Sequence, residues 1–263
     1  MYPATRRGWA LSVRQMAVPL GGTIAAALLP PLETIGGVRL PLFAGAVAVG
    51  VGGAAFAAVA DSEPLRREVT GRAFRKIVGA PGVVRLLLVA SIYIVVLQGV
   101  LVYSVPAVRA AGLSSFSAGA TFLAINATAM ASRLVWGRVA DRAGGTRRSR
   151  TLAEIGLLAS VGAVLFMFAL HAGAVAVVAA AVLFAFGAMG WNAVVYVSAG
   201  ERAGPELAAR SVALALTVVF LVSALCTPPL GALADHLGWD VFWLTTSALA
   251  LAGAIVAGTL PRA

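Results

Sequence analysis

Long apolar stretches separated by short polar segments run along the whole chain. Each stretch has roughly the 20 residues that a helix needs to cross the hydrocarbon core of a bilayer. Lipid offers no partners to backbone N–H and C=O groups, so stretches this apolar should be helices. The pattern predicts an all-α integral membrane protein with about eight transmembrane helices, at Trp9–Leu32, Leu40–Ala60, Val83–Val108, Ser115–Ala140, Thr151–His171, Ala174–Ser198, Ala208–Leu233 and Val241–Leu260.

A polar segment, Asp61–Pro81, interrupts this pattern and holds much of the charge. It divides the chain into a two-helix part at 1–60, a cytoplasmic connection at 61–82 and a six-helix part at 83–263. Apolar residues recur within it at near-helical spacing between the basic ones, namely Leu65, Val69, Phe74, Ile77 and Val78. That spacing predicts a short amphipathic helix on the cytoplasmic membrane surface, and it is compatible with the alternative of a solvated linker.

Composition and charge agree with a membrane protein. Hydrophobic residues make up 60% of the chain and charged residues only 11%, which is too little charge for a soluble domain of this length. The basic residues lie in or beside alternate ends of the predicted helices, and the other connections hold only Arg39 and Arg109. This positive-inside pattern predicts that both termini are cytoplasmic in a multi-pass protein of the cell inner (plasma) membrane. The net charge of +10 therefore does not indicate a nucleic-acid partner, which would need these residues on one soluble surface.

The connection after the fourth predicted helix carries a recognisable motif. It reads Gly137-Arg138-Val139-Ala140-Asp141-Arg142-Ala143-Gly144 and continues to Arg147 and Arg148. This resembles the cytoplasmic loop signature G-x-x-x-D-R-x-G of the major facilitator superfamily, with the basic pair displaced by Gly145-Thr146. Arg7–Gly22 resembles the fifth helix of that family, Gly190-Trp191-Asn192 the tenth, and Pro228–Asp235 with Gly238 the end of the eleventh.

The resemblance implies a fold of twelve helices in two six-helix bundles joined by a cytoplasmic loop. Aligned in this way, the chain carries helices five to twelve. It would form a partial fold, with the last two helices of the N-terminal bundle and a complete six-helix C-terminal bundle. We therefore expect an N-terminally truncated chain, and a true eight-helix protein is the alternative.

The loop signature also implies a conformational role. Gly137 and Gly144 permit a tight turn, and the family's symmetry brings Asp141 to the start of the Trp9–Leu32 helix. Unpaired N–H groups and partial positive charge favour an anion at that position. We hypothesise that Asp141, with Arg138 and Arg142, latches the two bundles together and stabilises the outward-facing state. In the alternative, the arginines only anchor the loop in the cytoplasm, which is our interpretation of Arg147, Arg148 and Arg150.

Polar residues inside the apolar stretches are candidates for a solute-binding cavity, because placing them in a membrane is costly. They are Arg14, Gln15, Ser91, Gln98, Asn126, Arg133, Trp191, Asn192 and Tyr196. Arg14 and Arg133 could instead snorkel to the interface, Trp191 could be an interfacial aromatic, and Gln98 and Asn126 could bond across helices. The two arginines give a hint of an anionic substrate.

Prolines and glycines mark candidate helix-packing positions and helix breaks, at Pro19, Gly21, Gly22, Pro228 and Pro229. Double prolines occur in the first and seventh predicted helices, which suggests a weak internal repeat of the kind found in secondary transporters. Val18–Gly22 lacks the first glycine of the family's antiporter signature, so the resemblance does not support drug–proton antiport.

The leading hypothesis is secondary active transport of a small solute by alternating access, with membrane lipid, the solute and a coupling ion as partners. An inactive fragment, or one subunit of a split transporter, is the alternative. A membrane-embedded enzyme is less favoured, because His171 and His236 lie at different helix ends and no hydrolase or metalloprotease motif is present in the sequence. With a single cysteine, Cys226, we expect no disulfide within the chain, and we expect no catalytic residue, metal site or cofactor.

Overall fold

The computed structural model describes residues 13, 16–59, 71–143 and 147–261, and this part of the chain is helical with short connections. The helices are α2 (Ala17–Gly36), α3 (Arg39–Val59), α4 (Gly71–Val78), α5 (Val83–Ala110), α6 (Ser115–Ala143), α7 (Arg148–Ala172), α8 (Ala174–Ala188), α9 (Trp191–Ala203) and α10 (Ala208–Gly258). The predicted all-α class is therefore confirmed.

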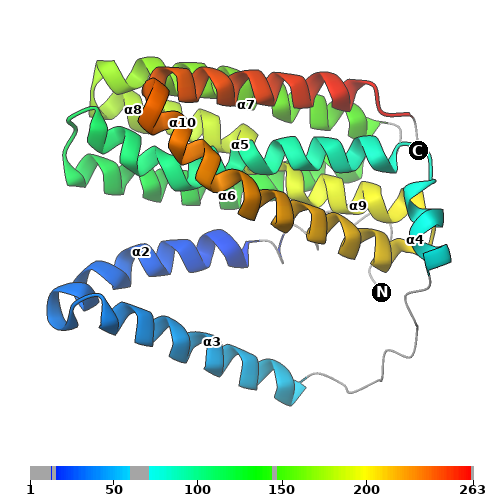
Figure 1. The fold of residues 1–263 in the computed structure, drawn as a ribbon, viewed down its shortest axis with the longest axis horizontal. Coiled ribbons are helices and arrows are strands. Elements are labelled where there is room, and N and C mark those ends of the chain that lie inside the picture. The colour runs from blue at the N-terminus through cyan, green and yellow to red at the C-terminus, as the bar shows by residue number, and fades with distance from the viewer. Residues whose placement is uncertain (1–12, 14–15, 60–70, 144–146, 262–263) are drawn as a thin grey trace.

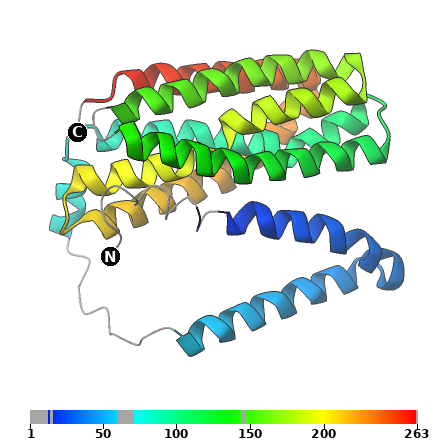
Figure 2. The same ribbon diagram turned by 180° about the vertical axis from the view of Figure 1, so that it is seen from behind.

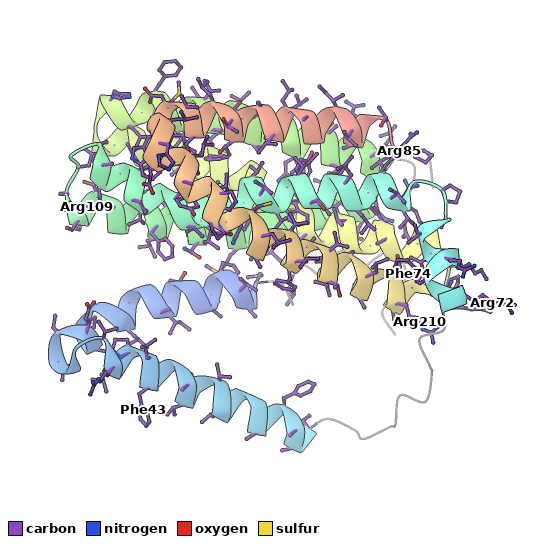
Figure 3. The ribbon with its side chains drawn as sticks, viewed as in Figure 1. Phe43, Arg72, Phe74, Arg85, Arg109 and Arg210 are labelled. Atoms are coloured by element: carbon purple, nitrogen blue, oxygen red, sulfur yellow. The ribbon has the colours of Figure 1, made fainter. Side chains whose placement is uncertain are left out.

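The helices from α5 to α10 pack side by side in one elongated bundle, and the α2–α3 hairpin lies along one flank of it (Figures 1 and 2). Within the hairpin only α2 packs against the bundle, through α6. Helix α3 diverges from the bundle and buries none of its residues. Figure 3 shows Phe43 of α3 projecting away from the protein, as an apolar side chain that faces lipid would.

Long apolar helices confirm the membrane-spanning character of the chain. In the described residues, α3, α5, α7, the joined segment Ala174–Ala203 and α10 are long and apolar enough to cross a membrane. At 51 residues, α10 would extend about 75 Å, more than twice the thickness of a hydrocarbon core, so it accounts for two predicted spans. With α2 and α6, which have the length of a span, the predicted set of about eight is complete.

The sixth predicted span needs correction, whereas the seventh and eighth agree with the bend in α10. The sixth continues past Ser198 to Ala203, and it is interrupted at Met189 and Gly190 between α8 and α9. The seventh and eighth follow one another along α10, and the backbone leaves the helical conformation at Gly238, in the predicted gap between them, with φ 85° and ψ 169°. A positive φ is strained for residues with a Cβ, so glycine is the residue that permits this sharp bend.

The double proline in α10 was expected to break the helix, but the helix continues through it. Pro228 and Pro229 provide no backbone N–H, so two carbonyls of the preceding turn lose their usual partners. Directly before the prolines, the carbonyl of Thr227 accepts a bond of 2.5 Å from the hydroxyl of Tyr103 in α5. This bond holds the proline-containing segment against α5, and the helix bends at Gly238 instead.

The centre of the bundle is apolar and closely packed. Trp243 of α10 makes edge-to-face contacts with Phe166 and Phe184, at ring-centroid distances of 4.9 and 5.8 Å. Glycines allow α7 and α8 to approach one another there. A Cβ at Gly162 would lie 2.5 Å from the Cα of Phe184, and one at Gly187 would lie 2.5 Å from the backbone N of Ala159. Small residues of this kind let membrane helices pack backbone against backbone.

We expect Gly162→Ala to destabilise the bundle, because the new methyl group would meet the backbone of α8. Overpacking of this kind costs about 1–3 kcal/mol. The matched control is Gly50→Ala in α3, where a Cβ would meet nothing within 4 Å. Thermal unfolding of the detergent-solubilised protein should show a lower melting temperature for the first variant and no decrease for the second. Equal melting temperatures would contradict the close approach of α7 and α8.

Candidate transport site and charge cluster

Three charged residues meet where α6 ends, α7 begins and α9 ends. Arg148, the first residue of α7, forms an ion pair with Glu201 in the last turn of α9, and the two side chains are 7% and 31% exposed. Asp141, in the last turn of α6, interacts electrostatically with the same guanidinium. The cluster therefore joins three helices at one end of the bundle.

Each member of this cluster has a charge that the dipole of its own helix disfavours. Helix N-termini favour anions and C-termini favour cations, yet Arg148 opens a helix while Asp141 and Glu201 lie at helix ends. Pairing the arginine with the two carboxylates offsets this cost. Arg148 is thus more than the topology anchor that we had assigned from sequence, because it is buried and paired across helices.

The other members of the loop signature are placed around this cluster. Gly137 is buried inside α6, which continues to Ala143, so the tight turn expected at Gly137 does not occur there. Arg138 and Arg142 are exposed. Gly144 lies outside the described residues, and so does the start of the Trp9–Leu32 segment that Asp141 was expected to approach. The latch between bundles therefore remains a hypothesis.

A second set of polar side chains is buried between α6 and α9, inside the apolar part of the bundle. Arg133 of α6 and Tyr196 of α9 are each 4% exposed, and the guanidinium and the phenol interact electrostatically. Asn192 lies one turn before Tyr196 and is 7% exposed. Its neighbour Trp191 is fully buried and has its ring centroid 6.2 Å from that of Tyr93. Three of the predicted cavity residues, Arg133, Asn192 and Tyr196, thus lie on facing helices.

Asn126 connects this region to the α2–α3 hairpin. It lies on the same face of α6 as Arg133, seven residues away, and its side chain donates to the carbonyl of Phe122 at 2.9 Å. Its Oδ1 lies 3.0 Å from the position that a Cβ at Gly22 of α2 would take. Gly22 therefore allows α2 to approach α6, whereas Gly21 faces open space and Pro19 is buried.

The remaining predicted cavity residues have other surroundings. Ser91 donates to the carbonyl of Leu87 in its own helix, and the side-chain amide of Gln98 donates to the hydroxyl of Thr227 at 3.0 Å. Gln98 thus belongs with Tyr103 to the contacts that hold the proline-containing turn of α10. Arg14 and Gln15 lie outside the described residues.

Sequence reasoning missed Glu201, Tyr103 and Thr227. Glu201 follows the sixth predicted span directly, and an acidic residue there, beside many arginines, could have been noticed. Tyr103 and Thr227 are 124 residues apart, and nothing in the local pattern predicts that they meet. Thr227 did carry one signal, since it directly precedes Pro228.

A cavity of about 270 Å³ lies at the opposite end of the bundle, beside the bend in α10. His171, Trp239 and Asp240 line it together with backbone at Gly238, and the imidazole lies 3.4 Å from the carboxylate. Of the predicted cavity residues that the structure describes, none lines this space. The described residues contain no group of three or more His, Cys, Asp or Glu that could hold a metal ion.

These features define a multi-pass membrane protein that holds polar side chains inside a helical bundle and a charge cluster at one end of it. A sequence profile of the Major Facilitator Superfamily matches residues 1–227. The chain belongs to this superfamily of membrane transporters, as the loop signature had indicated. A search of curated proteins finds no match.

We expect Glu201→Gln to lower the stability of the bundle, because Arg148 would keep its charge and its burial while losing a carboxylate partner. Leaving a buried charged group poorly compensated costs about 1–3 kcal/mol. The control is Glu154→Gln, which removes an exposed pair with Arg150 within one helix and should change the melting temperature little. A Glu201→Gln protein as stable as the control would show that the pair contributes nothing.

Proposed function

We propose that this protein moves a small solute across the membrane by alternating access, as a secondary transporter. The observation that carries the proposal is the buried polar group formed by Arg133, Asn192 and Tyr196 between two membrane helices, in a chain of the transporter superfamily. Ionisable residues inside membrane helices are costly, and they mark substrate or ion pathways more often than they serve packing. A purely structural core would have been more stable with apolar residues at these positions.

The chemistry of the site favours a solute with an anionic group. A guanidinium is always charged and offers several N–H donors in a planar fork, which suits carboxylates and phosphates. Asn192 and Tyr196 could add neutral donors to the same solute. On α6, Asn126 and Arg133 share the face that is turned toward α2, so the solute would bind near the contact between the hairpin and the bundle.

Alternating access requires that this contact opens and closes. The α2–α3 hairpin touches the bundle mainly through α6, and such a narrow contact can rearrange more easily than the closely packed α7–α8 pair. The proposed latch of Asp141, with Arg138 and Arg142, on the start of the first predicted helix would stabilise the state that is closed on the cytoplasmic side. We place the protein in the plasma membrane with both termini in the cytoplasm, because the basic residues gather at this end of the bundle.

Transport can be tested by reconstituting the protein in liposomes and measuring uptake of radiolabelled acetate, succinate, phosphate, glucose and lysine. We expect uptake of one or more of the anions, and a loss of about 100-fold in Arg133→Gln if the guanidinium binds the anion directly. The control, Arg150→Gln, removes an exposed arginine and should transport normally. Uptake of glucose or lysine that is unaffected by Arg133→Gln would contradict the site. A folded protein that transports none of the solutes would favour the alternative, in which this chain is one subunit of a split transporter.

We expect Asp141→Asn to shift the protein toward the state that is open to the cytoplasm. The reporter is Met130→Cys in a Cys226→Ser background, because Met130 lies one turn from Asn126 on the face of α6 toward α2. In inside-out vesicles, a membrane-impermeant thiol reagent should label this cysteine about fivefold faster in the Asp141→Asn protein, which corresponds to about 1 kcal/mol of conformational bias. Equal labelling rates with and without Asp141 would contradict the latch.

A further inference from the structure

The short helix α4 lies across the basic end of the bundle, whereas the bundle helices run along its length (Figures 1 and 2). Two of its residues, Ala73 and Ile77, are buried against Val83 at the start of α5 and Leu207 just before α10. A helix at the end of a membrane bundle, perpendicular to the spans, lies in the plane of the membrane surface.

The corner between α4 and α5 is held firmly, so this orientation is a fixed feature of the fold. Gly82 takes φ 78°, and a Cβ there would collide with the side chains of Arg202 and Pro261. Arg202 of α9 donates to the carbonyls of Pro81 and Pro261, at 2.9 and 2.6 Å. The guanidinium of Arg202 thus connects this corner to Pro261, which follows α10.

The apolar arc of α4 is wider than the bundle covers. At 100° per residue, Phe74 and Val78 extend the arc of Ala73 and Ile77 to one side, and the phenyl ring of Phe74 remains 51% exposed. The rest of the helix surface is basic, with Arg72, Arg75 and Lys76 exposed. Figure 3 shows Arg72 and Phe74 at the outer end of the bundle, with Arg210 of α10 beside them.

We propose that α4 is a binding site for anionic membrane lipids, in which Arg72, Arg75 and Lys76 hold the headgroup and Phe74 enters the acyl region beneath it. The stretch from Gly71 to Arg85 carries four basic residues and no acidic one, so nothing within it competes for these cations. The cytoplasmic leaflet is anionic, and each basic side chain near its surface gains about 1 kcal/mol.

An exposed aromatic side chain on one side of a short helix, with three cations on the other, fits a lipid better than the other possible occupants. A free phosphate would be held by the cations and would leave Phe74 in water. A further protein segment would have to be acidic and apolar at once. The boundary between headgroups and acyl chains offers both properties at the depth where aromatic side chains concentrate. The proposal depends on the basic end facing an anionic leaflet, and failure of solute transport would leave it intact.

The first test measures lipid retention by native mass spectrometry of the full chain, released from vesicles containing equal amounts of phosphatidylglycerol and phosphatidylcholine. We expect the triple variant Arg72→Gln/Arg75→Gln/Lys76→Gln to retain about tenfold less phosphatidylglycerol than the parent chain. The matched control is Arg138→Gln/Arg142→Gln/Arg147→Gln, which removes the same charge at the same end but leaves α4 unchanged, and it should lose less phosphatidylglycerol than the α4 variant. Equal losses in both variants, or no loss in the first, would overturn the proposal.

The second test locates Phe74, and it does not depend on the triple variant folding. Phe74→Cys in a Cys226→Ser background is labelled with a fluorophore, and the protein is placed in vesicles containing brominated lipids. The proposal expects quenching by the brominated acyl chains and weak quenching by aqueous iodide. Quenching by iodide alone, combined with release of phosphatidylglycerol by inorganic phosphate, would identify a free-anion site. Protection from both quenchers would identify a protein segment over α4, and either result would overturn the proposal.

Discussion

The absence of water inside a bilayer is the constraint on which the rest of this structure depends. Every backbone N–H and C=O in the membrane must find a partner within the protein, which leaves helices as the units of this chain. Helix α10 continues through two prolines, and Tyr103 of α5 donates to the carbonyl of Thr227 beside them. The same constraint makes each buried polar side chain a candidate for a structural or functional role. Its burial is unfavourable unless the side chain is paired or contributes to function.

Charge is separated along the bundle in a way that follows from this constraint. Basic residues gather at one end, where Asp141 and Glu201 compensate Arg148 against unfavourable helix dipoles. Arg133 is different, since it is placed inside the bundle with a phenol as its neighbour. In our account the two arginines have different roles. Arg148 stabilises the packing of α6, α7 and α9, and Arg133 contacts the transported solute.

Much of the fold could be predicted from the sequence, because the apolar stretches are long and the motif at the end of α6 is specific. The short helix α4 was predicted as well, from Phe74 and Ile77 between basic residues, although its Leu65 and Val69 lie outside the described part. The bend of α10 at Gly238 falls in the predicted gap between Leu233 and Val241, whereas local rules wrongly interpret Pro228 as a break. The partners of Arg148 and Gln98 could not be predicted either, because ion pairs and hydrogen bonds between helices far apart in the sequence produce no periodic pattern.

Alternating access requires that one solute site faces each side of the membrane in turn, and trans-stimulation is the most direct test of this proposal. Liposomes containing the reconstituted protein would be loaded with an unlabelled solute, and the entry of the same labelled solute would be followed without any ATP. Our account predicts that the internal solute accelerates entry, because a loaded carrier returns in exchange and the site is never open to both sides. Entry that is independent of the internal solute, and that rises linearly with external concentration, would indicate a pore and would contradict alternating access.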